Sequence, residues 1–521
     1  MLLVAACTSW CGLGRQGIMT WDEGIYYDEA RFVVQAVNAL RTGGDIAHAT
    51  SGFAPRQARP LNVALNTLGE AVFGIHPWVP AALAGLWGVL CICGTYVLGR
   101  RVFGERVGLF AAFLLLISPY FLQYRRMGLP EAAGTLAALL ILLRLLALHD
   151  RPERRPWLNS LGLGLMLGVA VTINVRVGVL LPVVALFRLW WLPGDKPAGR
   201  LAGHALLLLA GVAALMAFCE TPYCLLPLFI HSPTPLFSYF GQLAHFAGAT
   251  QEAGRPSLLT AALAPLLFLL YFEAPGLLLG LVAVTRRQIW RHPQALLLLA
   301  CLGAQGLALY HYVPYARYLS WVLPALMVLA AYGLTRLTDG LPPRARMVAV
   351  AGLLLVCLAH ASFRAVPILQ AHGAMHEAAA WLASRPVGAV VTSDASIAMD
   401  YTDLPLVQLP DGAEEARAVI ARADAHGPSY VLLDRQQFMA GTFVMTGDSY
   451  VRSAGGVISR AVAPQWTARQ FRRLFMPFCF EHNRDTLQTL RTGRIFARDG
   501  EAISIYTAPD ALRALEGRVP R

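Results

Sequence analysis

The sequence predicts a polytopic α-helical membrane protein that carries a small α/β domain at its C-terminal end. Hydrophobic residues make up 56% of the 521 residues and charged residues only 14%, whereas a soluble domain has about a quarter charged residues. Apolar runs long enough to cross a bilayer as helices recur as far as residue 363. After residue 364 the composition becomes that of a soluble domain.

About eleven apolar runs are expected to be transmembrane helices. They lie at residues 1–17, 79–98, 107–122, 132–148, 158–173, 177–192, 202–219, 258–284, 294–310, 319–335 and 345–363. The first run begins "MLLVAAC", which resembles a lipoprotein cleavage site, but no basic residues precede it. We therefore interpret it as a short first span.

The formal charge of +12 belongs to the membrane part of the chain. From Arg364 onward, the sequence contains 17 Lys and Arg residues and 16 Asp and Glu residues, which gives a net charge of +1. The excess lies in short loops such as "GRRVFGER", "HDRPERRP" and "TRRQIWRHP", as expected for loops on the cytoplasmic side. No basic face on a soluble module is apparent, so we expect no nucleic-acid partner.

An N-terminus in the cytoplasm places all these Arg-rich loops in the cytoplasm. The extracytoplasmic side then receives a first outer loop at residues 15–78 and a second at 220–257. It also receives residues 364–521, which leaves 1–363 as the transmembrane domain. This orientation is the one that the charge pattern favours.

The outer regions have recognisable local patterns. In the first loop, "YYDEARFVVQAVNAL" and "RQARPLNVALNTLGEAVFG" show helical apolar spacing, which predicts two helices along the membrane surface. The second loop is rich in Pro and aromatic residues, as substrate-covering loops often are. In the C-terminal region, "VGAVVTSD", "YVLLD" and "AISIYTAP" predict strands and "EEARAVIARADAHG" predicts a helix. That region has no Gly-rich phosphate loop and no nucleophile elbow, so its role stays open.

Several charged residues fall at the extracytoplasmic boundary of the spans. They are Asp22, Glu23, Arg125, Arg126, Glu131, Arg176, His311 and Arg317. A charged group in or beside a bilayer is costly, so each is a functional hypothesis. Arginine binds phosphate oxygens with two nitrogens, and a carboxylate can accept a proton from an attacking hydroxyl. The set therefore suits a reaction on a lipid phosphate.

Four blocks of sequence, in order, resemble those of glycosyltransferases of the GT-C superfold. The resemblance is to the protein-mannosyltransferase type (glycosyltransferase family 39) and the aminoarabinose-transferase type, and it covers roughly residues 15–335. The blocks are "WDEGIYYDEARFVVQAVNALRTGG", "RPLNVALNTLGEAVFGIHPWVPAALAGLWGV", "RRVFGERVGLFAAFLLLISPYFLQYRRMGLPEA" and "ARYLSWVLPAL". Three features depart from the family pattern: Glu131 stands where Asp is common, Asn174 and Arg176 stand where a Lys is frequent, and the first span is short.

The resemblance implies an inverting glycosyltransferase of the bacterial inner membrane. Its donor would be a sugar on a polyprenyl phosphate, and its acceptor a hydroxyl or phosphate on a lipid, a glycan or a protein. Carried over by position, Asp22 would be the general base and Glu23 would orient the acceptor. Arg126 and Arg317 would hold the leaving phosphate, with Tyr318 nearby. Further substrate contacts would be Arg59, Glu131, Arg176 and His311.

Other interpretations remain open from the residues themselves. Asp22 and Glu23 also fit an acid pair at a helix N-terminus, and Arg125 and Arg126 fit anchors that reach the lipid headgroups. Asp22, Glu23 and His311 could bind a divalent cation, although no compact ligand motif predicts an obligatory metal. A transporter or flippase of a lipid-linked substrate is the alternative class, but the two halves show no matched repeats.

Overall fold

The computed structural model describes most of the helical part of the chain and the central part of the C-terminal region. The described residues are 1–11, 13, 21–43, 59–150, 154–193, 197–225, 258–311, 316–370, 374–392, 402, 404–409, 413–434, 496–498 and 503–515. The chain divides into two compact units. One comprises Met1–Cys11 with Glu29–Ile368, and the other Gly12–Asp28 with Leu369–Arg521.

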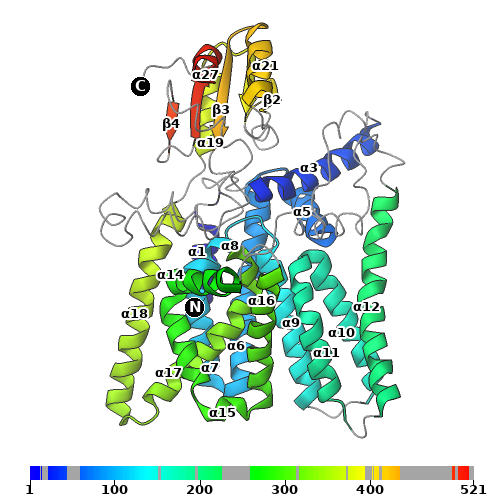
Figure 1. Ribbon diagram of the computed structural model, residues 1–521, viewed down its shortest axis with the longest axis vertical. Coiled ribbons are helices and arrows are strands. Elements are labelled where there is room, and N and C mark those ends of the chain that lie inside the picture. The colour runs from blue at the N-terminus through cyan, green and yellow to red at the C-terminus, as the bar shows by residue number, and fades with distance from the viewer. Residues whose placement is uncertain are drawn as a thin grey trace. The chain divides into compact units, whose positions relative to one another are not determined.

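The first unit is helical (Figure 1). Its elements are α1 (Leu2–Trp10), most of α3 (Trp21–Thr42), α5 (Pro60–Phe73), α6 (Trp78–Phe103), α7 (Glu105–Ile117), α8 (Pro119–Tyr124), α9 (Glu131–Asp150), α10 (Pro156–Ile173), η1 (Val175–Val179), α11 (Leu180–Trp190), α12 (Ala198–Leu225), α14 (Leu258–Val284), α15 (Arg287–Trp290), α16 (Pro293–His311), η3 (Ala316–Val322), α17 (Leu323–Thr338) and α18 (Pro343–Gln370). The two surface helices predicted in the first outer loop are confirmed as helices by α3 and α5.

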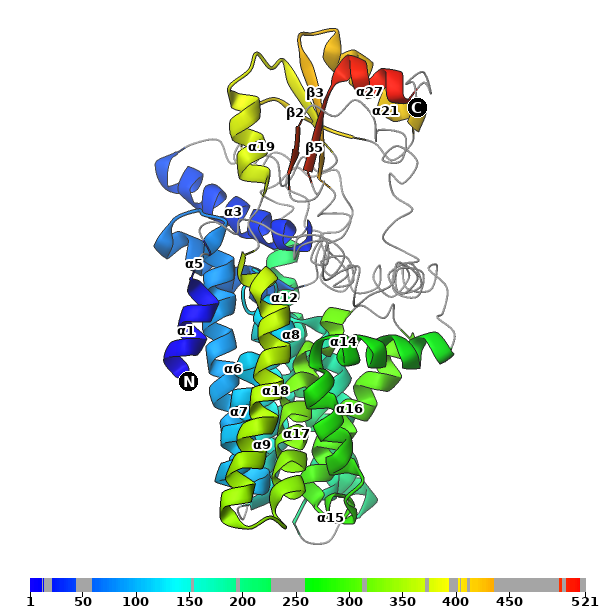
Figure 2. The ribbon, with the colours of Figure 1, turned by 90° about the vertical axis from the view of Figure 1, so that its left-hand side faces the viewer.

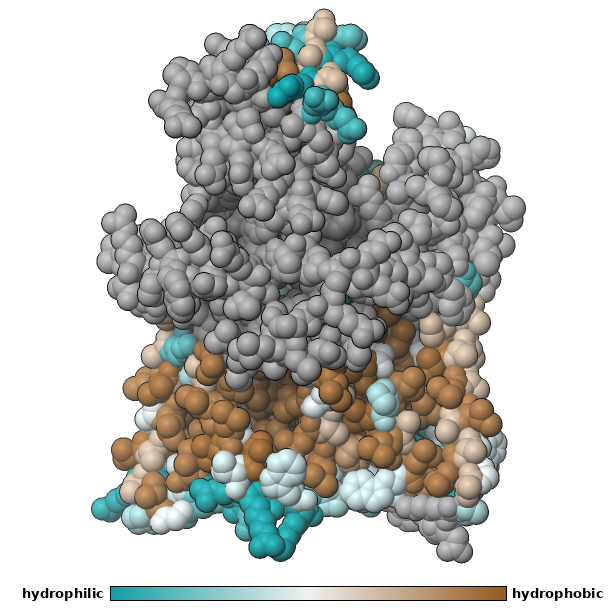
Figure 3. Space-filling view, in the orientation of Figure 1, coloured by the Kyte–Doolittle hydropathy of each residue, from teal (hydrophilic) through white to brown (hydrophobic). Residues whose placement is uncertain are grey.

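The protein is a multi-pass membrane protein. Six helices in the described residues are long and apolar enough to cross a bilayer. They lie at Trp78–Phe103, Glu131–Asp150, Pro156–Ile173, Ala198–Glu220, Tyr318–Thr338 and Pro343–Phe363. Two shorter apolar helices lie at Glu273–Val284 and Pro293–Ala308. Figure 3 shows the surface of these helices as a largely apolar band with hydrophilic side chains along its lower edge. The expectation of about eleven spans stays a prediction.

Some predicted spans are shorter or broken in the structure. The run 107–122 is divided between α7 and α8, because Ser118 and Pro119 start a new helix there. Ser118 Oγ accepts a hydrogen bond from Phe121 N at 3.0 Å, and Pro119 needs no backbone partner. The run 177–192 begins as the 3₁₀ turn η1. Helix α1 has only nine residues, about 14 Å of rise, which is short of a bilayer core.

Connections alternate between the two ends of the helices. At one end lie the α6–α7 turn at Gly104 and the α14–α16 connection, where Arg286, Arg287 and Arg291 are exposed. Helix α8 lies toward the other end (Figure 1), where it packs against η3, and the turn η1 packs against α9. The structure therefore separates the Arg-rich loops from the predicted site segments.

Close helix contacts depend on glycine. A Cβ on Gly164 of α10 would collide with the carbonyl oxygen of Leu208 on α12, and a Cβ on Gly333 of α17 with that of Leu279 on α14. Small residues allow backbones to approach in this way, which is how membrane helices gain packing energy without a hydrophobic driving force between them.

The second unit contains a five-stranded mixed sheet of order β2-β1-β3-β5-β4. The strands are β1 (Ala389–Thr392), β2 (Leu406–Gln408), β3 (Ser429–Asp434), β4 (Phe496–Arg498) and β5 (Ile503–Thr507), and the helices are α19 (Ala374–Ala383), α21 (Ala413–Asp424) and α27 (Ala508–Leu515). Strand β1 pairs in parallel with β2 and β3, and β5 pairs antiparallel with β3 and β4. The three predicted strands and the predicted helix are confirmed by β1, β3, β5 and α21.

We predict that Gly164→Ala destabilises the protein by about 1–3 kcal/mol, because the new methyl group forces α10 away from α12. Thermal unfolding in detergent measures this as a lower Tm. Gly162→Ala is the matched control on the same helix, since no atom lies within 4 Å of its Cβ. An equal change in Tm for both variants would contradict the close contact.

Candidate functional site

The best-defined polar cluster of the first unit consists of Glu131, Arg176 and Tyr318, which come from three separate elements. Glu131 is the first residue of α9, where a carboxylate is favoured by the helix dipole. Arg176 lies in η1, directly after α10 ends. Asn174 Oδ1 accepts a hydrogen bond from Arg176 N at 3.3 Å, which closes this turn. Tyr318 lies in η3.

The guanidinium of Arg176 holds the cluster together. Arg176 Nη1 donates a hydrogen bond to Glu131 Oε1 at 2.9 Å, and Arg176 Cζ lies 3.8 Å from the centroid of the Tyr318 ring. The Glu131 side chain is fully buried, whereas that of Arg176 is 16% exposed. A buried carboxylate that is ionised is stabilised by such a charged partner. The structure thus brings together three residues that the sequence analysis proposed one by one.

The cluster keeps unused capacity to bind. Glu131 Oε2 is buried and has no hydrogen-bond partner in the described part of the chain. Arginine has five donors in a planar fork, and the Nη1 contact with Glu131 uses only part of it. Because the guanidinium is held in place by the carboxylate and the ring, its partly exposed side can bind a phosphate with little loss of side-chain entropy.

Arg125 and Arg126 hold the end of α1. Arg126 Nη1 donates hydrogen bonds to Thr8 O at 2.8 Å and Cys11 O at 2.9 Å, and Arg125 Nη2 donates one to Thr8 Oγ1 at 2.8 Å. Cations commonly bind the free carbonyls at a helix C-terminus in this way. Both side chains are buried, with 1% exposure. Arg126 therefore has a structural contact in addition to the phosphate contact that the sequence predicted, and that phosphate contact stays a prediction.

The environment of the two arginines disfavours their charge. Burial, with the charge of Arg126 added to it, lowers the pKa of Arg125 to about 9. Burial also lowers the pKa of Arg126. A pKa of about 9 still leaves the guanidinium of Arg125 protonated at neutral pH, so it can donate its hydrogen bonds.

Helix α5 buries a polar face. Arg59, at its N-terminal end, is 3% exposed, and Asn62, Asn66 and Glu70 on successive turns are also buried. Leu68, Val72 and Phe73 are exposed instead. Arg59 was predicted from the sequence as a substrate contact, whereas Asn62, Asn66 and Glu70 were not predicted. Polar residues at positions i, i+4 and i+8 of an otherwise apolar helix were the available signal.

Glu273 was also missed by the sequence analysis. It is 5% exposed and lies inside α14, at a residue with non-helical backbone angles. Its carboxylate accepts a hydrogen bond from Ser118 Oγ at 2.6 Å. A single acid within a long apolar run was the signal that could have identified it, because charged groups in membrane segments are functional candidates by default.

The remaining predicted residues are located only by their backbone. Asp22 and Glu23 lie in the first turn of α3, in the part of the chain that clusters with the second unit. His311 ends α16 and Arg317 lies in η3. The side chains of these four residues lie outside the described atoms, so their roles stay predictions.

The described residues contain no group of three or more His, Cys, Asp or Glu side chains that could hold a metal ion. The sequence suggests three ligands for a divalent cation, Asp22, Glu23 and His311, and their side chains lie outside the described atoms. The cation therefore stays a hypothesis, and no chemical step proposed for this chain depends on it.

Comparisons with known proteins agree with this architecture. The sequence profile of the family described as dolichyl-phosphate-mannose-protein mannosyltransferase matches residues 57–221. The fold is similar to that of ArnT from Cupriavidus metallidurans bound to undecaprenyl phosphate, with a TM-score of 0.54 and 16% identity over 84% of this chain and 93% of that chain. It is also similar to that of the oligosaccharyltransferase AglB from Archaeoglobus fulgidus, in complex with an inhibitory peptide and a dolichol-phosphate. That match has a TM-score of 0.50 and 15% identity over 84% of this chain and 69% of that chain.

No curated protein matches the sequence. The structural likenesses at 15–16% identity establish the fold, and the sequence profile covers about a third of the chain. The chain has the GT-C fold, the architecture of membrane glycosyltransferases that use polyprenyl-phosphate carriers. The fold class and the family resemblance predicted from the sequence are thereby confirmed.

We predict that Arg126→Gln lowers the free energy of unfolding by about 3 kcal/mol, because two hydrogen bonds from a charged group to α1 are weakened or lost. Thermal unfolding of the detergent-solubilised protein checks this. Arg106→Gln is the control, since Arg106 is exposed, and its Tm should stay at the wild-type value. An unchanged Tm for Arg126→Gln would show that the contacts with α1 add no stability.

Proposed function

We propose that the protein is an inverting glycosyltransferase that moves a sugar from a polyprenyl phosphate to an acceptor on the extracytoplasmic face of the bacterial inner membrane. The observation that carries the proposal is Arg176, a guanidinium held by Glu131 and Tyr318 in a GT-C fold. The two similar structures contain undecaprenyl phosphate and a dolichol-phosphate, which are both polyprenyl phosphates. That likeness supports a lipid-linked donor for this chain.

The reaction follows from the proposed groups. The acceptor hydroxyl attacks the anomeric carbon, the bond from that carbon to the phosphate oxygen breaks, and polyprenyl phosphate leaves. Asp22 accepts the proton of the acceptor hydroxyl, and Glu23 orients the acceptor. Arg176 binds the phosphate as its negative charge grows, so cationic stabilisation replaces a general acid at the leaving group. Arg59, Arg126, His311, Arg317 and Tyr318 are further proposed substrate contacts.

The acceptor is proposed only as a class: a hydroxyl or phosphate group on a lipid, a glycan or a protein. The second outer loop at 220–257 and the C-terminal region at 364–521, which we place on the extracytoplasmic side, are the proposed sources of acceptor selectivity. The reason is that loops and appended domains vary while the helical scaffold holds the reaction.

We predict that Asp22→Asn lowers the rate of polyprenyl phosphate release at least about 100-fold, the usual contribution of a general base. Purified protein in nanodiscs would receive a panel of radiolabelled polyprenyl-phosphate sugars, with membrane extract as acceptor. Glu105→Gln is the control, because Glu105 begins α7 at the end that carries the Arg-rich loops. Release by both wild type and Asp22→Asn would move the base to Glu23 or to Asp28, a further carboxylate in α3. No release by folded wild type with any donor would contradict the proposed function.

We predict that Arg176→Lys weakens the binding of polyprenyl phosphate about tenfold, because an ammonium group replaces a planar fork and its stacking on Tyr318. Equilibrium binding of radiolabelled polyprenyl phosphate to nanodisc-embedded protein measures the Kd. Arg106→Lys, at an exposed position, should bind like the wild type. Equal Kd values for all three proteins would exclude Arg176 from the phosphate site.

A further inference from the structure

Glu273 connects a bent helix to the segment that leads into the Glu131 cluster. Helix α14 changes direction, as Figure 2 shows, and its backbone is non-helical at Glu273. At this bend the carboxylate Oε1 accepts hydrogen bonds from Ser118 Oγ at 2.6 Å and from Tyr120 N at 3.3 Å. Both donors belong to the start of α8.

The start of α8 depends on these contacts. A helix begins with backbone N–H groups that have no partner within the helix. In α8, Pro119 has no N–H, Phe121 N donates to Ser118 Oγ, and Tyr120 N donates to Glu273. A helix of six residues has little stability of its own. Its position is therefore set by such contacts with its neighbours.

Two tyrosines of α8 continue the connection to the cluster. The rings of Tyr120 and Tyr124 pack edge to face with their centroids 4.9 Å apart. Tyr124 interacts electrostatically with Glu131 and Arg176, and α8 packs against η3, the element that carries Tyr318. The Tyr120 hydroxyl is hydrogen-bonded to the backbone of Leu319, the residue after Tyr318. A shift of α8 would thus reach both the ion pair and the ring that hold Arg176.

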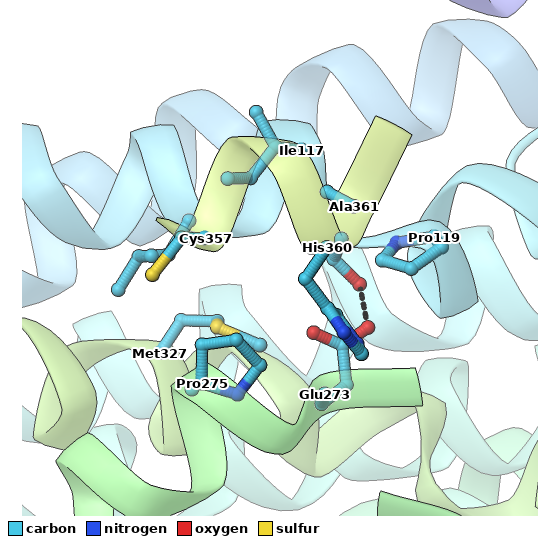
Figure 4. A pocket seen from close by; sticks show the side chains of 11 residues that line it. Ile117, Pro119, Glu273, Pro275, Met327, Cys357, His360 and Ala361 are labelled. Carbon is cyan, nitrogen blue, oxygen red and sulfur yellow. Dashed lines mark hydrogen bonds between the residues drawn. The ribbon is translucent and has the colours of Figure 1, made fainter. Parts of the chain in front are cut away.

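The carboxyl group of Glu273 is surrounded mostly by apolar side chains and makes its hydrogen bonds to the start of α8. Figure 4 shows it at the edge of a small cavity, with Pro119 on α8, His360 on α18 and Met327 on α17 around it. Apart from Ser118, Glu273, Cys357 and His360, the lining residues are apolar. A buried carboxyl group in such surroundings is held firmly by its hydrogen bonds, because a buried polar group that loses its partners is costly.

We propose that Glu273 is a positioning residue for the phosphate-binding cluster: it holds α8 so that Glu131, Arg176 and Tyr318 keep the geometry that binds the lipid phosphate. The inference rests on the proposed function, because that function gives Arg176 the phosphate. Glu273 itself contacts no substrate in this scheme and acts through α8. Its predicted effect is therefore coupled to Arg176.

The test compares variants of the full chain in nanodiscs. Glu273→Ala removes both contacts with α8, and Glu273→Gln keeps a carbonyl oxygen that can accept them. Ser160→Ala is the matched control, because it also removes a buried polar group. The Ser160 hydroxyl accepts a hydrogen bond from Arg188 Nε at 2.8 Å and lies 2.9 Å from His204 Nδ1. Ser160 lies near the start of α10, whereas η1 follows the end of that helix. Each variant is measured for Tm, for kcat/KM of polyprenyl phosphate release and for the Kd of polyprenyl phosphate.

Glu273→Ala should lower kcat/KM and weaken polyprenyl phosphate binding about tenfold each at temperatures where the protein is folded, and Glu273→Gln should stay within about threefold of wild type. Ser160→Ala should lower Tm without changing either quantity by more than about twofold. In an Arg176→Gln background, Glu273→Ala should cause no further loss, because the residue through which it acts is already gone. A purely structural role would not produce this coupling.

Equal losses of kcat/KM for Glu273→Ala and Ser160→Ala, or additive losses with Arg176→Gln, would overturn the inference. If folded wild type binds polyprenyl phosphate but releases none from any donor, the proposed function is contradicted and the inference about Glu273 is not. The binding cycle with Arg176→Gln would then still decide the role of Glu273. Absence of polyprenyl phosphate binding by the wild type would overturn both.

Discussion

The structure depends on one constraint: a charged or strongly polar group that leaves water beside a bilayer must be given a partner inside the protein. The ion pair between Arg176 and Glu131 meets this constraint for two residues at once, and the Tyr318 ring covers the guanidinium. Arg126 meets it with the carbonyl oxygens at the end of α1, and Glu273 with the start of α8. Because an unpaired buried charge costs several kcal/mol, each of these contacts fixes the relative position of the elements that supply it. The charges therefore organise one end of the helices, in addition to any chemistry they perform.

Interruptions of the helices make these contacts geometrically available. Alpha-helical backbone satisfies its own hydrogen bonds, so irregular backbone near a bilayer occurs only where other protein groups complete it. Here the break between α7 and α8 is completed by Ser118 and Glu273, and the end of α10 by Asn174. A Cβ on Gly134 of α9 would approach Asn174 Cβ to 2.9 Å, so α9 can pack against this turn only with a glycine there. At each break, a polar side chain makes hydrogen bonds to backbone groups that the helix leaves without partners. The same places that limit the lengths of the helices thus create the polar cluster.

The GT-C fold gives these local features a common purpose in the proposed reaction. In the proposed reaction, the phosphate of the lipid lies near the membrane surface and binds the partly exposed side of Arg176, whose ion-pair partner Glu131 is buried. Chemistry on such a substrate needs a cation for the leaving phosphate and a base for the acceptor, and the two requirements differ physically. A cation stabilises the leaving phosphate more strongly where water is excluded and its geometry is fixed, and the helical unit provides both. The proposed base, Asp22, is the second residue of α3.

The sequence by itself determined the class of protein, the positions of most helices and three of the five strands of the second unit, and it singled out Arg176 and Glu131 as candidates. These properties follow from apolar run lengths, from alternation and from the high cost of charge at a membrane, all of which are local in the chain. Only the tertiary structure decided which partner each of these polar side chains meets. It paired Arg176 with Glu131, 45 residues apart, and Glu273 with Ser118, 155 residues apart. It also placed Arg126 Nη1 against the carbonyl oxygen of Thr8 near the end of α1, 118 residues away in the sequence. Hydropathy carries no information about such pairs, because they depend on which helix faces pack together and on where each helix breaks.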